Sequence, residues 1–445
     1  MSERLLIRVR ALTPRTFETR LREIRIHRGL SKVVWERAHR ILRDVQERGD
    51  EALLECAARF DGVVLSRDRL RVELEAVRAA YREVSREAIR ALALVKRRLE
   101  WAERRWLDAL KRVRVVADGV VIESVPRPIR SVGCYIPGGR AAYPSSVLMS
   151  VVPARLAGVE RIAICSPPMR ETGEVHPLVL VAADLCGVTE IYRVGGAAAI
   201  AALAYGTATI PPVEKIVGPG GPYVVAAKLL VAERVGIDLP AGPSELVILA
   251  DETAPPEAIA ADLMAQAEHG EESLCGLLTT SRRLAQETAR ALSARSCGAA
   301  RREIIRQALA RRGFLLYTEG DLDLLVRFAN ALAPEHVQVM TRRPRVVARA
   351  LTQAGLVLIG PHSPASASDY VLGTNHVLPT GGAAAAYSGL SVLDFLKRVT
   401  YAECARRSLA RFLEPVRVLA VAEGLPNHYR ALEERMRSVD RRVRR

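Results

Sequence analysis

The sequence predicts an α/β protein built on parallel β-sheets that helices cover on both faces. Two observations lead to this prediction. From about residue 131 to 360, short runs rich in β-branched residues alternate with longer segments of helical periodicity, which is typical of β-α-β units. Apolar residues make up 49% of the chain and charged residues 26%, the composition of a globular protein. The expected strands cover residues 131–136, 161–165, 190–194, 215–217, 246–250, 276–279, 314–317, 337–340 and 356–359.

The segments before this alternation predict other structures. Apolar residues recur every three or four positions in 34–45 and in 74–99, which predicts amphipathic helices. Asp118-Gly119 lies between two β-rich runs and is a strong signal for a hairpin with a two-residue turn.

Composition limits the class of protein. A chain of 445 residues holds roughly two to four domains. No apolar run reaches the roughly 18 residues that a membrane helix needs, and the charged start, MSERLLIRVR, is unlike a signal peptide. The seven cysteines form no CxxC pair, which is typical of reduced thiols. We therefore expect a cytoplasmic protein that does not bind membranes.

The net charge of +16 raises the alternative of nucleic-acid binding. However, the arginines are spread along the whole chain, and only residues 437–445 form a dense basic run. Aromatic residues are 4% of the chain, too few for platforms on which bases stack. The charge is better explained as a solvated cationic surface.

Four of the eight histidines indicate a chemical site. They lie in four short segments, far apart in the sequence, and each segment also holds a carboxylate or an amide. Folds assemble metal sites and acid–base sites from separate loops in this way, whereas a structural histidine needs no such neighbours. The segments are 266–269, 335–336, 365–379 and 423–428.

Three of these segments contain candidate metal ligands. Gln266 and His269, three residues apart near the end of a helical run, share a helix face, although a polar helix end would give the same pattern. Asp369 follows the last predicted strand, where a parallel sheet presents ligand groups. His428 lies in the helical tail, where a solvent-exposed imidazole is the alternative. This set of nitrogen and oxygen ligands suits zinc, and manganese or cobalt would also fit.

Glu335 and His336 are candidates for acid–base chemistry. A histidine that titrates near neutrality can take the proton of an alcohol, and a nearby carboxylate can activate a water molecule. Adjacent residues of an extended chain point in opposite directions, so one substrate meets both side chains only if the backbone is turned here.

Three turns rich in glycine each open a helical segment, at 135–139, 194–196 and 218–221. Without Cβ atoms, backbone N–H groups can approach a phosphate at the start of a helix. None of the turns reads GxGxxG, and tight packing would explain each one alone. Together, at the ends of successive strands, they suggest a dinucleotide cleft.

The motifs that carry these residues resemble, in order, those of the histidinol dehydrogenase family. The likeness runs from about residue 31 to 430. The matching segments are VGCYIPGGRAAYPSSVLM, VGGAAAIAALAYGT, KIVGPGGPYVVAAK, LPAGPSE, ADLMAQAEHG, APEHVQV, DYVLGTNHVLPT and AEGLPNH.

This resemblance implies an enzyme of histidine biosynthesis that oxidises L-histidinol to L-histidine through histidinaldehyde, using NAD and zinc. It implies that His336 takes the alcohol proton, that Glu335 activates water against the aldehyde, and that Tyr135 contacts NAD. One zinc ion per subunit would be bound by Gln266, His269, Asp369 and, from the partner chain, His428. Substrate contacts would come from Ser244, Gln266, His269, His336, Asp369, His376, Glu423 and His428.

The resemblance also implies two Rossmann-like domains and a homodimer that exchanges its C-terminal tails. The first domain would contain residues 31–135 and 244–392 with the catalytic and metal residues, and the second, on the NAD side, residues 136–243. Residues 1–30 carry little pattern and are expected to form an arm. Residues 393–445 are expected to form a helical dimerisation tail, because their apolar stripe is too small to make a core.

The chain departs from the family pattern at a few positions. Ala198 and Gly221 stand where the family usually has glutamine and asparagine side chains that contact the nucleotide. Ala365 and Ser368 stand where it usually has glutamate and glycine. These changes keep open the alternative of a family dehydrogenase that acts on another polar alcohol. The positive charge keeps open a non-catalytic or nucleic-acid-binding descendant, although the zinc and acid–base residues are intact.

Overall fold

The structure is a computed structural model. The residues that it describes are 6–25, 30–138, 142–239 and 242–443. The chain divides into two compact units, of which the first contains Met1–Leu107 and Ile129–Phe395, and the second Asp108–Pro128 and Leu396–Arg445. Across the described ranges, every helix is too short or too polar to cross a membrane.

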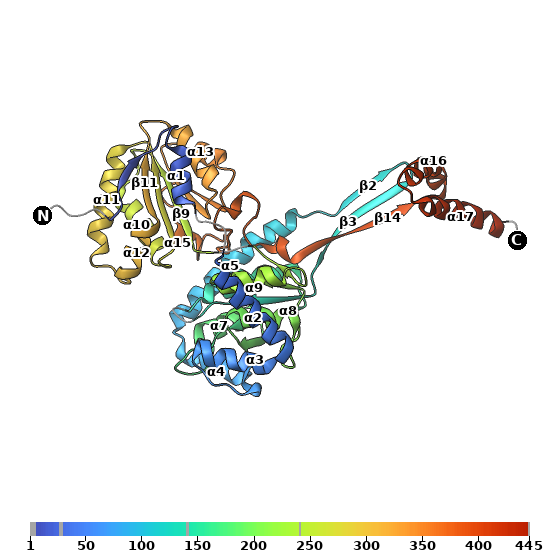
Figure 1. The fold of residues 1–445 in the computed structure, drawn as a ribbon, viewed down its shortest axis with the longest axis horizontal. Coiled ribbons are helices and arrows are strands. Elements are labelled where there is room, and N and C mark those ends of the chain that lie inside the picture. Colours follow the sequence, from blue (N-terminus) through green and yellow to red (C-terminus); the bar gives the residue numbers. More distant parts are fainter. Residues whose placement is uncertain (1–5, 26–29, 139–141, 240–241, 444–445) are drawn as a thin grey trace. The chain divides into compact units, whose positions relative to one another are not determined.

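The first unit contains a six-stranded sheet in which all neighbouring strands are parallel. In spatial order, its strands are β1 (Val9–Ala11), β11 (Gly313–Tyr317), β10 (Leu274–Thr279), β9 (Glu245–Ala250), β12 (His336–Met340) and β13 (Leu356–Ile359). The helices of this region are α1 (Phe17–Ile24), α10 (Pro256–Ala267), α11 (Arg282–Ser296), α12 (Arg302–Arg312), α13 (Leu322–Leu332), α14 (Pro344–Ala350) and α15 (Ala365–Ser368). Figure 1 shows them on both faces of the sheet.

Helices cover both faces because both faces are apolar. Along β9, Leu246 and Ile248 belong to one hydrophobic cluster, with α10, α11 and α12. Val247 and Leu249 belong to another, with α1, α13 and α14. Successive residues of a strand point to opposite faces, so a continuous apolar run is what a parallel sheet buried on both sides requires. The α/β class and the strands predicted from the sequence are confirmed.

A second sheet of the first unit has five strands, again all parallel. In spatial order they are β6 (Glu190–Arg193), β5 (Arg161–Ser166), β4 (Ser131–Tyr135), β7 (Lys215–Val217) and β8 (Gly236–Ile237). The helices of this region include α6 (Pro144–Ala157), α7 (Pro177–Leu185), α8 (Gly196–Tyr205) and α9 (Pro222–Val231). Residues 197–204 of α8 are all buried, so this helix is apolar all round rather than amphipathic.

The predicted membership of the two domains needs a correction. Residues 31–135 were predicted to join 244–392, but β4 is the central strand of the five-stranded sheet. The apolar stripe of α2 (Lys32–Arg48), with Leu42 and Val45, also belongs to the hydrophobic cluster of α8. The short alanine side chains of α8 let another helix approach closely, which explains why α2 packs there. Sequence order alone does not reveal this pairing.

Other elements connect these layers. They are α3 (Asp50–Cys56), a π-helix at Ala57–Asp61, α4 (Leu74–Glu83), α5 (Arg86–Ala109), and 3₁₀ turns at Arg67–Arg69, Ala383–Ala385 and Val392–Phe395.

The segment predicted as an N-terminal arm contributes the edge strand β1 and the packed helix α1 to the region of the six-stranded sheet. In β1, Val9 lies opposite Leu315, so the segment adds an edge strand. The ring of Phe17 in α1 contacts Phe328 of α13, with 5.3 Å between the ring centroids. A strand of three residues is too short to leave a periodic pattern in the sequence, which is why it was missed.

The second unit combines an antiparallel sheet with two helices (Figure 1). Its strands, in the order β14, β3, β2, are β14 (Leu396–Cys404), β3 (Val120–Pro128) and β2 (Val113–Ala117). The helices are α16 (Arg406–Ala422) and α17 (Pro426–Val443). The predicted hairpin turn is confirmed, because Asp118 and Gly119 have φ angles of 51° and 73°, as a type I′ turn requires. The tail is not wholly helical as predicted, since it begins with β14.

A buried ion pair fixes one of the glycine-rich turns. Lys228 of α9 and Asp238 are both almost fully buried and form an ion pair. Asp238 accepts a hydrogen bond from the backbone N–H of Gly218 at 2.7 Å, and Lys228 donates to the carbonyl oxygen of Gly218 at 3.1 Å. The pair therefore satisfies both polar groups of a turn residue whose φ of +118° favours glycine.

We predict that Lys228→Met lowers the free energy of unfolding by about 3–5 kcal/mol, because it leaves the carboxylate of Asp238 buried without its partner. Urea denaturation followed by circular dichroism measures this change. Arg130→Met is the matched control: its ion pair with Glu214 at 2.7 Å is largely exposed, so the loss should stay at or below about 1 kcal/mol. Equal losses in the two variants would contradict the prediction.

Candidate active site

The predicted acid–base pair lies at the start of β12, next to the start of β9. Glu335 and Glu245 are 5% and 2% exposed. Each carboxylate accepts a hydrogen bond from the backbone N–H of the other residue: Glu245 N donates to Glu335 Oε2 at 2.7 Å, and Glu335 N donates to Glu245 Oε2 at 3.1 Å. This exchange holds the side chain of Glu335 in one position.

His336 lies beside Glu245 and Glu335 and is 4% exposed. Its Nδ1 lies 3.2 Å from the carbonyl oxygen of Glu245 and 3.6 Å from Oε2 of Glu335. Because a carbonyl oxygen only accepts, Nδ1 must carry the proton, and Nε2 of the neutral ring is then free to act as a base. Nε2 is buried and has no hydrogen-bond partner among the described residues. The chain turns at Ala333, whose φ is 51°, before it enters the strand. The 3.6 Å contact shows that the two neighbouring side chains meet.

The charges around His336 favour its protonated form. Burial alone would lower the pKa of His336, but the carboxylates of Glu335 and Asp369 and the carbonyl group of Glu245 outweigh it, and the net shift is upward. A base with a raised pKa binds the proton it receives more firmly. The arrangement is therefore suited to accepting a proton from a weakly acidic group such as an alcohol.

Glu245 is the residue that the sequence reasoning missed. Burial, followed by repulsion from Glu335, raises the pKa of Glu245 to about 7. Its Oε1 accepts from the backbone N–H of Gly381 at 2.9 Å. The available signal was a glutamate that opens β9, a strand whose other residues, Leu-Val-Ile-Leu-Ala, are all apolar. A carboxylate at a buried strand position calls for a specific partner.

His376 and Asp369 form a second part of the site. Nδ1 of His376 donates to the carbonyl oxygen of Asp369 at 3.0 Å. Burial lowers the pKa of His376, against the opposing charge of Asp369. The next residue toward the N-terminus, Asn375, donates to the carbonyl oxygen of Met149 in α6 at 2.7 Å, so this loop joins the helices of the five-stranded sheet. Asp369 also contributes to the pKa of His336, which places its charge near the acid–base pair.

Gln266 and His269 lie at the end of α10, as predicted. Gln266 is 5% exposed, and its side-chain nitrogen has no hydrogen-bond partner among the described residues. His269 follows the last helical turn and is exposed. Zinc would bind the amide oxygen of Gln266 and an imidazole nitrogen of His269, and both residues lie at the same end of α10. The donor set is therefore compatible with zinc.

The last two predicted site residues belong to the second unit. Glu423 is the C-cap residue just after α16, and His428 lies in the first turn of α17; both are exposed. Within the described residues, no group of three or more His, Cys, Asp or Glu side chains is gathered closely enough to hold a metal ion. The predicted ligand set has only His269 and Asp369 of these types in the first unit, so it does not form such a group there.

The edge of the sheet that carries this site differs from the expected one. Asp369 was expected at the carboxyl ends of the parallel strands, where ligands usually bind. However, Glu245 and His336 open β9 and β12, so the acid–base pair lies at the amino ends. Helix α10 follows β9 and returns toward this edge, which brings Gln266 to the same end of the sheet. The loop that holds Asp369 must also return to it, since its charge acts on His336.

The five-stranded sheet uses its carboxyl edge instead. Tyr135 ends β4, is 5% exposed, and accepts a hydrogen bond from the backbone N–H of Gly196 at 3.2 Å. Burial raises the pKa of Tyr135 to about 12, so its hydroxyl keeps its own proton for donation. The N-caps of α8 and α9, Gly195 and Gly221, provide no side-chain hydrogen bond, which leaves backbone N–H groups at both helix starts for a phosphate.

The departures from the family pattern are placed as follows. Ala198 is 3% exposed within α8, and a Cβ atom at Gly221 would meet nothing within 4 Å. Ala365 is 6% exposed at the start of α15, and the hydroxyl of Ser368 donates to its carbonyl oxygen at 2.7 Å. Ser244, just before Glu245, is half-buried. The first glycine-rich turn and the start of the PAGPSE segment lie partly outside the described residues.

Two parallel sheets, one with a buried glutamate–histidine pair and the other with helices that open on glycine, are the features of an α/β enzyme. Residues 27–436 match the family model of histidinol dehydrogenase, and the chain belongs to this family. It is therefore an oxidoreductase of histidine biosynthesis. Histidinol dehydrogenase from Methanothermobacter thermautotrophicus is 46% identical over 399 residues, 89% of this chain and 92% of the relative. That from Methanocaldococcus jannaschii is 43% identical, over 89% of this chain and 91% of the relative.

A solved structure agrees with this assignment. The crystal structure of histidinol dehydrogenase from Elizabethkingia anophelis superposes with a TM-score of 0.91 at 33% identity, covering 98% of this chain and 99% of that one. The fold class and the family expected from the sequence motifs are thereby confirmed.

We predict that the free energy of unfolding decreases as pH rises from about 4.5 to about 7, and that this decrease is smaller in Glu245→Gln. With a folded pKa of about 7, Glu245 binds a proton that the unfolded chain, at about 4.5, has already released. Its contribution is complete below pH 4.5 and is lost through pH 7, at up to about 1.4 kcal/mol per pH unit. Urea denaturation at several pH values measures the slope. Glu319→Gln, at an exposed position, is the control and should keep the wild-type slope.

Proposed function

We propose that this chain oxidises L-histidinol to L-histidine through histidinaldehyde, with NAD as the hydride acceptor and one zinc ion per subunit. The observation that carries the proposal is the buried pair of Glu335 and His336, with Nδ1 of the histidine bonded and Nε2 without a partner. An alcohol needs a base and an aldehyde needs an activated water, and this pair offers one group for each. Family membership supports the substrate.

The residues of the pair have separate roles in the proposal. His336 accepts the hydroxyl proton of the alcohol at Nε2, while the carbonyl oxygen of Glu245 fixes the ring through Nδ1. Glu335, held by the backbone N–H of Glu245, takes a proton from the water that adds to the aldehyde. Bound NAD would accept a hydride in each of the two oxidations, and bound zinc would hold the nitrogen groups of the substrate.

The binding residues follow from the same proposal. Zinc would be held by Gln266, His269, Asp369 and His428. The substrate would also meet Ser244, His376 and Glu423. Tyr135 would contact NAD near the start of α8, where the N-cap is Gly195 and the N–H of Gly196 donates to the Tyr135 hydroxyl.

We infer a homodimer in which His428 of the partner subunit completes the metal site. Support comes from the second unit, which exposes large apolar side chains on its sheet and on α16. Such surface favours burial against another chain. The exposed residues include Val115, Val116, Ile122, Val418, Leu419 and Val421. We also place the protein in the cytoplasm, because all seven cysteines are free.

The experiment that tests the function is NADH formation from L-histidinol in buffer that contains zinc. Two molecules of NADH per histidinol and the appearance of histidine are expected. Oxidation of another polar alcohol, with histidinol left unchanged, would favour the alternative specificity that the changes at Ala365, Ala198 and Gly221 keep open. No reaction with any alcohol would favour a non-catalytic descendant.

We predict that His336→Ala slows histidinol oxidation by about 10²–10⁴-fold, while Glu335→Gln slows mainly the aldehyde step by a similar factor. The glutamine can still accept the hydrogen bond from Glu245, so the backbone contact is kept while the base is lost. Supplying histidinol and histidinaldehyde in separate assays distinguishes the two steps. If both variants lose both steps equally, the two residues do not divide the work as proposed.

We predict that the purified protein holds about one divalent metal ion per chain, and that His269→Ala or Asp369→Ala removes most of it. Elemental analysis of dialysed protein measures this content without reference to activity. His362→Ala is the control, because His362 is an exposed histidine in the loop after β13. Full metal content in all three variants would refute the ligand assignment.

A further inference from the structure

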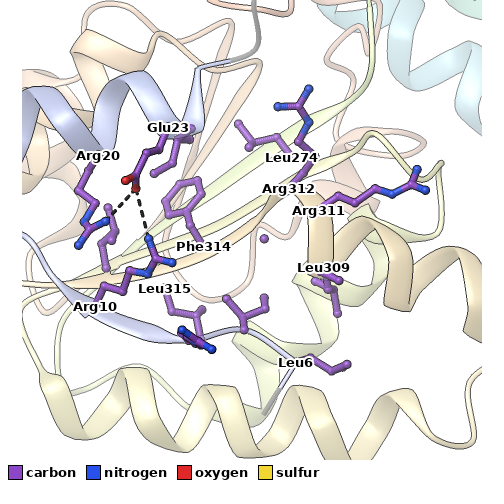
Figure 2. A pocket seen from close by; sticks show the side chains of 16 residues that line it. Leu6, Arg10, Arg20, Glu23, Leu274, Leu309, Arg311, Arg312, Phe314 and Leu315 are labelled. Carbon is purple, nitrogen blue, oxygen red and sulfur yellow. Dashed lines mark hydrogen bonds and ion pairs between the residues drawn. The ribbon is translucent and has the colours of Figure 1, made fainter. Parts of the chain in front are cut away.

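A hollow of about 500 Å³ lies at the amino ends of β10 and β11, beside β1. Its wall is formed by the N-terminal segment up to β1, by α1, by the end of α12 and by the start of β11 (Figure 2). None of its lining residues is a candidate active-site residue. Its volume lies within the range of about 300–1,000 Å³ that is usual for small-molecule sites.

The hollow is strongly enriched in arginine. Five of its sixteen lining residues are arginines, about twice the share that the 66 lysines and arginines have among all 445 residues. The five are Arg8, Arg10, Arg20, Arg311 and Arg312, and they come from different segments of the chain. Among the described residues of the lining, Glu23 is the one that is acidic. The general arginine content of the protein therefore does not account for this cluster.

Glu23 neutralises only part of this charge. It accepts from Arg20 at 2.8 Å and from Arg10 at 3.2 Å, as the dashed lines of Figure 2 show. Arg20 still has an unsatisfied donor, because its Nε is buried and has no partner among the described residues. The Arg20 side chain as a whole is 23% exposed, so other N–H groups of its guanidinium can face a ligand.

The opposite side of the hollow carries Arg311 and Arg312, with the ring of Phe314 between the two sides (Figure 2). Arg311 contacts Glu271 at 3.0 Å and Glu272 at 3.6 Å, and Arg312 contacts Glu272 at 3.3 Å; neither glutamate lines the hollow. Each guanidinium group has five N–H donors in a planar fork, so these contacts leave other donors for a ligand.

We propose that this hollow binds a small organic phosphate, such as a nucleotide-sized polyphosphate. Arginines on two sides match a ligand with more than one anionic group, and the guanidinium fork matches phosphate oxygens in pairs. The floor is apolar, with Leu274, Leu309 and Leu315 all buried, and it suits the organic part of such a ligand. The site is separate from the NAD cleft proposed at the five-stranded sheet.

Calorimetric titration with ATP and with inorganic tripolyphosphate tests the proposal. Saturating NAD is present, so that the proposed dinucleotide cleft is occupied. We expect one binding event per chain, weakened by about ten-fold or more in Arg20→Gln and in the double variant Arg311→Gln/Arg312→Gln, because each loses charge-assisted hydrogen bonds. Tighter binding of ATP than of tripolyphosphate would mean that the apolar floor contacts the organic part of the ligand. Equal binding would mean that only the phosphates are recognised.

The matched control is Arg345→Gln/Arg349→Gln, which removes the same charge from exposed positions on α14. It should bind both probes as wild type does. Thermal melting checks that Arg20→Gln is folded. If it is unfolded, the affinity of the double variant Arg311→Gln/Arg312→Gln tests the site instead. Absence of saturable binding would overturn the proposal. An equal loss of affinity in the control and in Arg311→Gln/Arg312→Gln would also overturn it, because binding would then reflect general attraction to a cationic surface.

Discussion

The exchange of hydrogen bonds between Glu245 and Glu335 is the contact on which the rest of the candidate site depends. It satisfies two buried backbone N–H groups at the amino ends of β9 and β12, where no further strand residue is available to do so. The same contact brings the carbonyl oxygen of Glu245 to Nδ1 of His336 and so fixes the tautomer of that ring. Burial of Glu245, reinforced by repulsion from Glu335, raises the pKa of Glu245 to about 7.

The two parallel sheets offer opposite edges for chemistry. The five-stranded sheet presents the carboxyl ends of its strands, where Tyr135 and the openings of α8 and α9 lie. The six-stranded sheet presents the amino end of β12 with the acid–base pair. The hydrogen bond from Asn375 to Met149 joins the loop of His376 to a helix of the other sheet. Under the proposed function, the dinucleotide binds at one sheet and the alcohol at the other sheet of the same unit.

Much of the fold could be predicted from local pattern, because a strand buried on both faces must be apolar throughout. β9 and β12 illustrate this, and so does the turn at Asp118-Gly119, whose dihedral angles few other residue pairs tolerate. The predictions that failed concern elements whose packing partners are distant in the sequence. The stripe of α2 specifies an apolar partner but not that α8 is this partner. β14 is mostly exposed, and its pattern does not distinguish it from a helix.

The site was predictable only in part, for a similar reason. Histidines next to carboxylates marked Glu335 and His336, and the structure brings their side chains together with Asp369 and His376 in one charged neighbourhood. Glu245 has no histidine beside it in the sequence, and its importance appears only when β9 lies next to β12. The choice of the amino edge also depends on chain topology, because α10 must return past the sheet before Gln266 can reach it.

The second unit is built from two segments that lie almost 270 residues apart in the chain, and β3 is its central strand, with β2 on one side and β14 on the other. Truncation of the chain after residue 395 would therefore remove more than a terminal tail. It would strip β3 of a partner over nine paired residues and turn it into an open edge. An unpaired edge with apolar residues recruits strands from other molecules. A shortened version of this protein would thus tend to aggregate even with the first unit correctly folded.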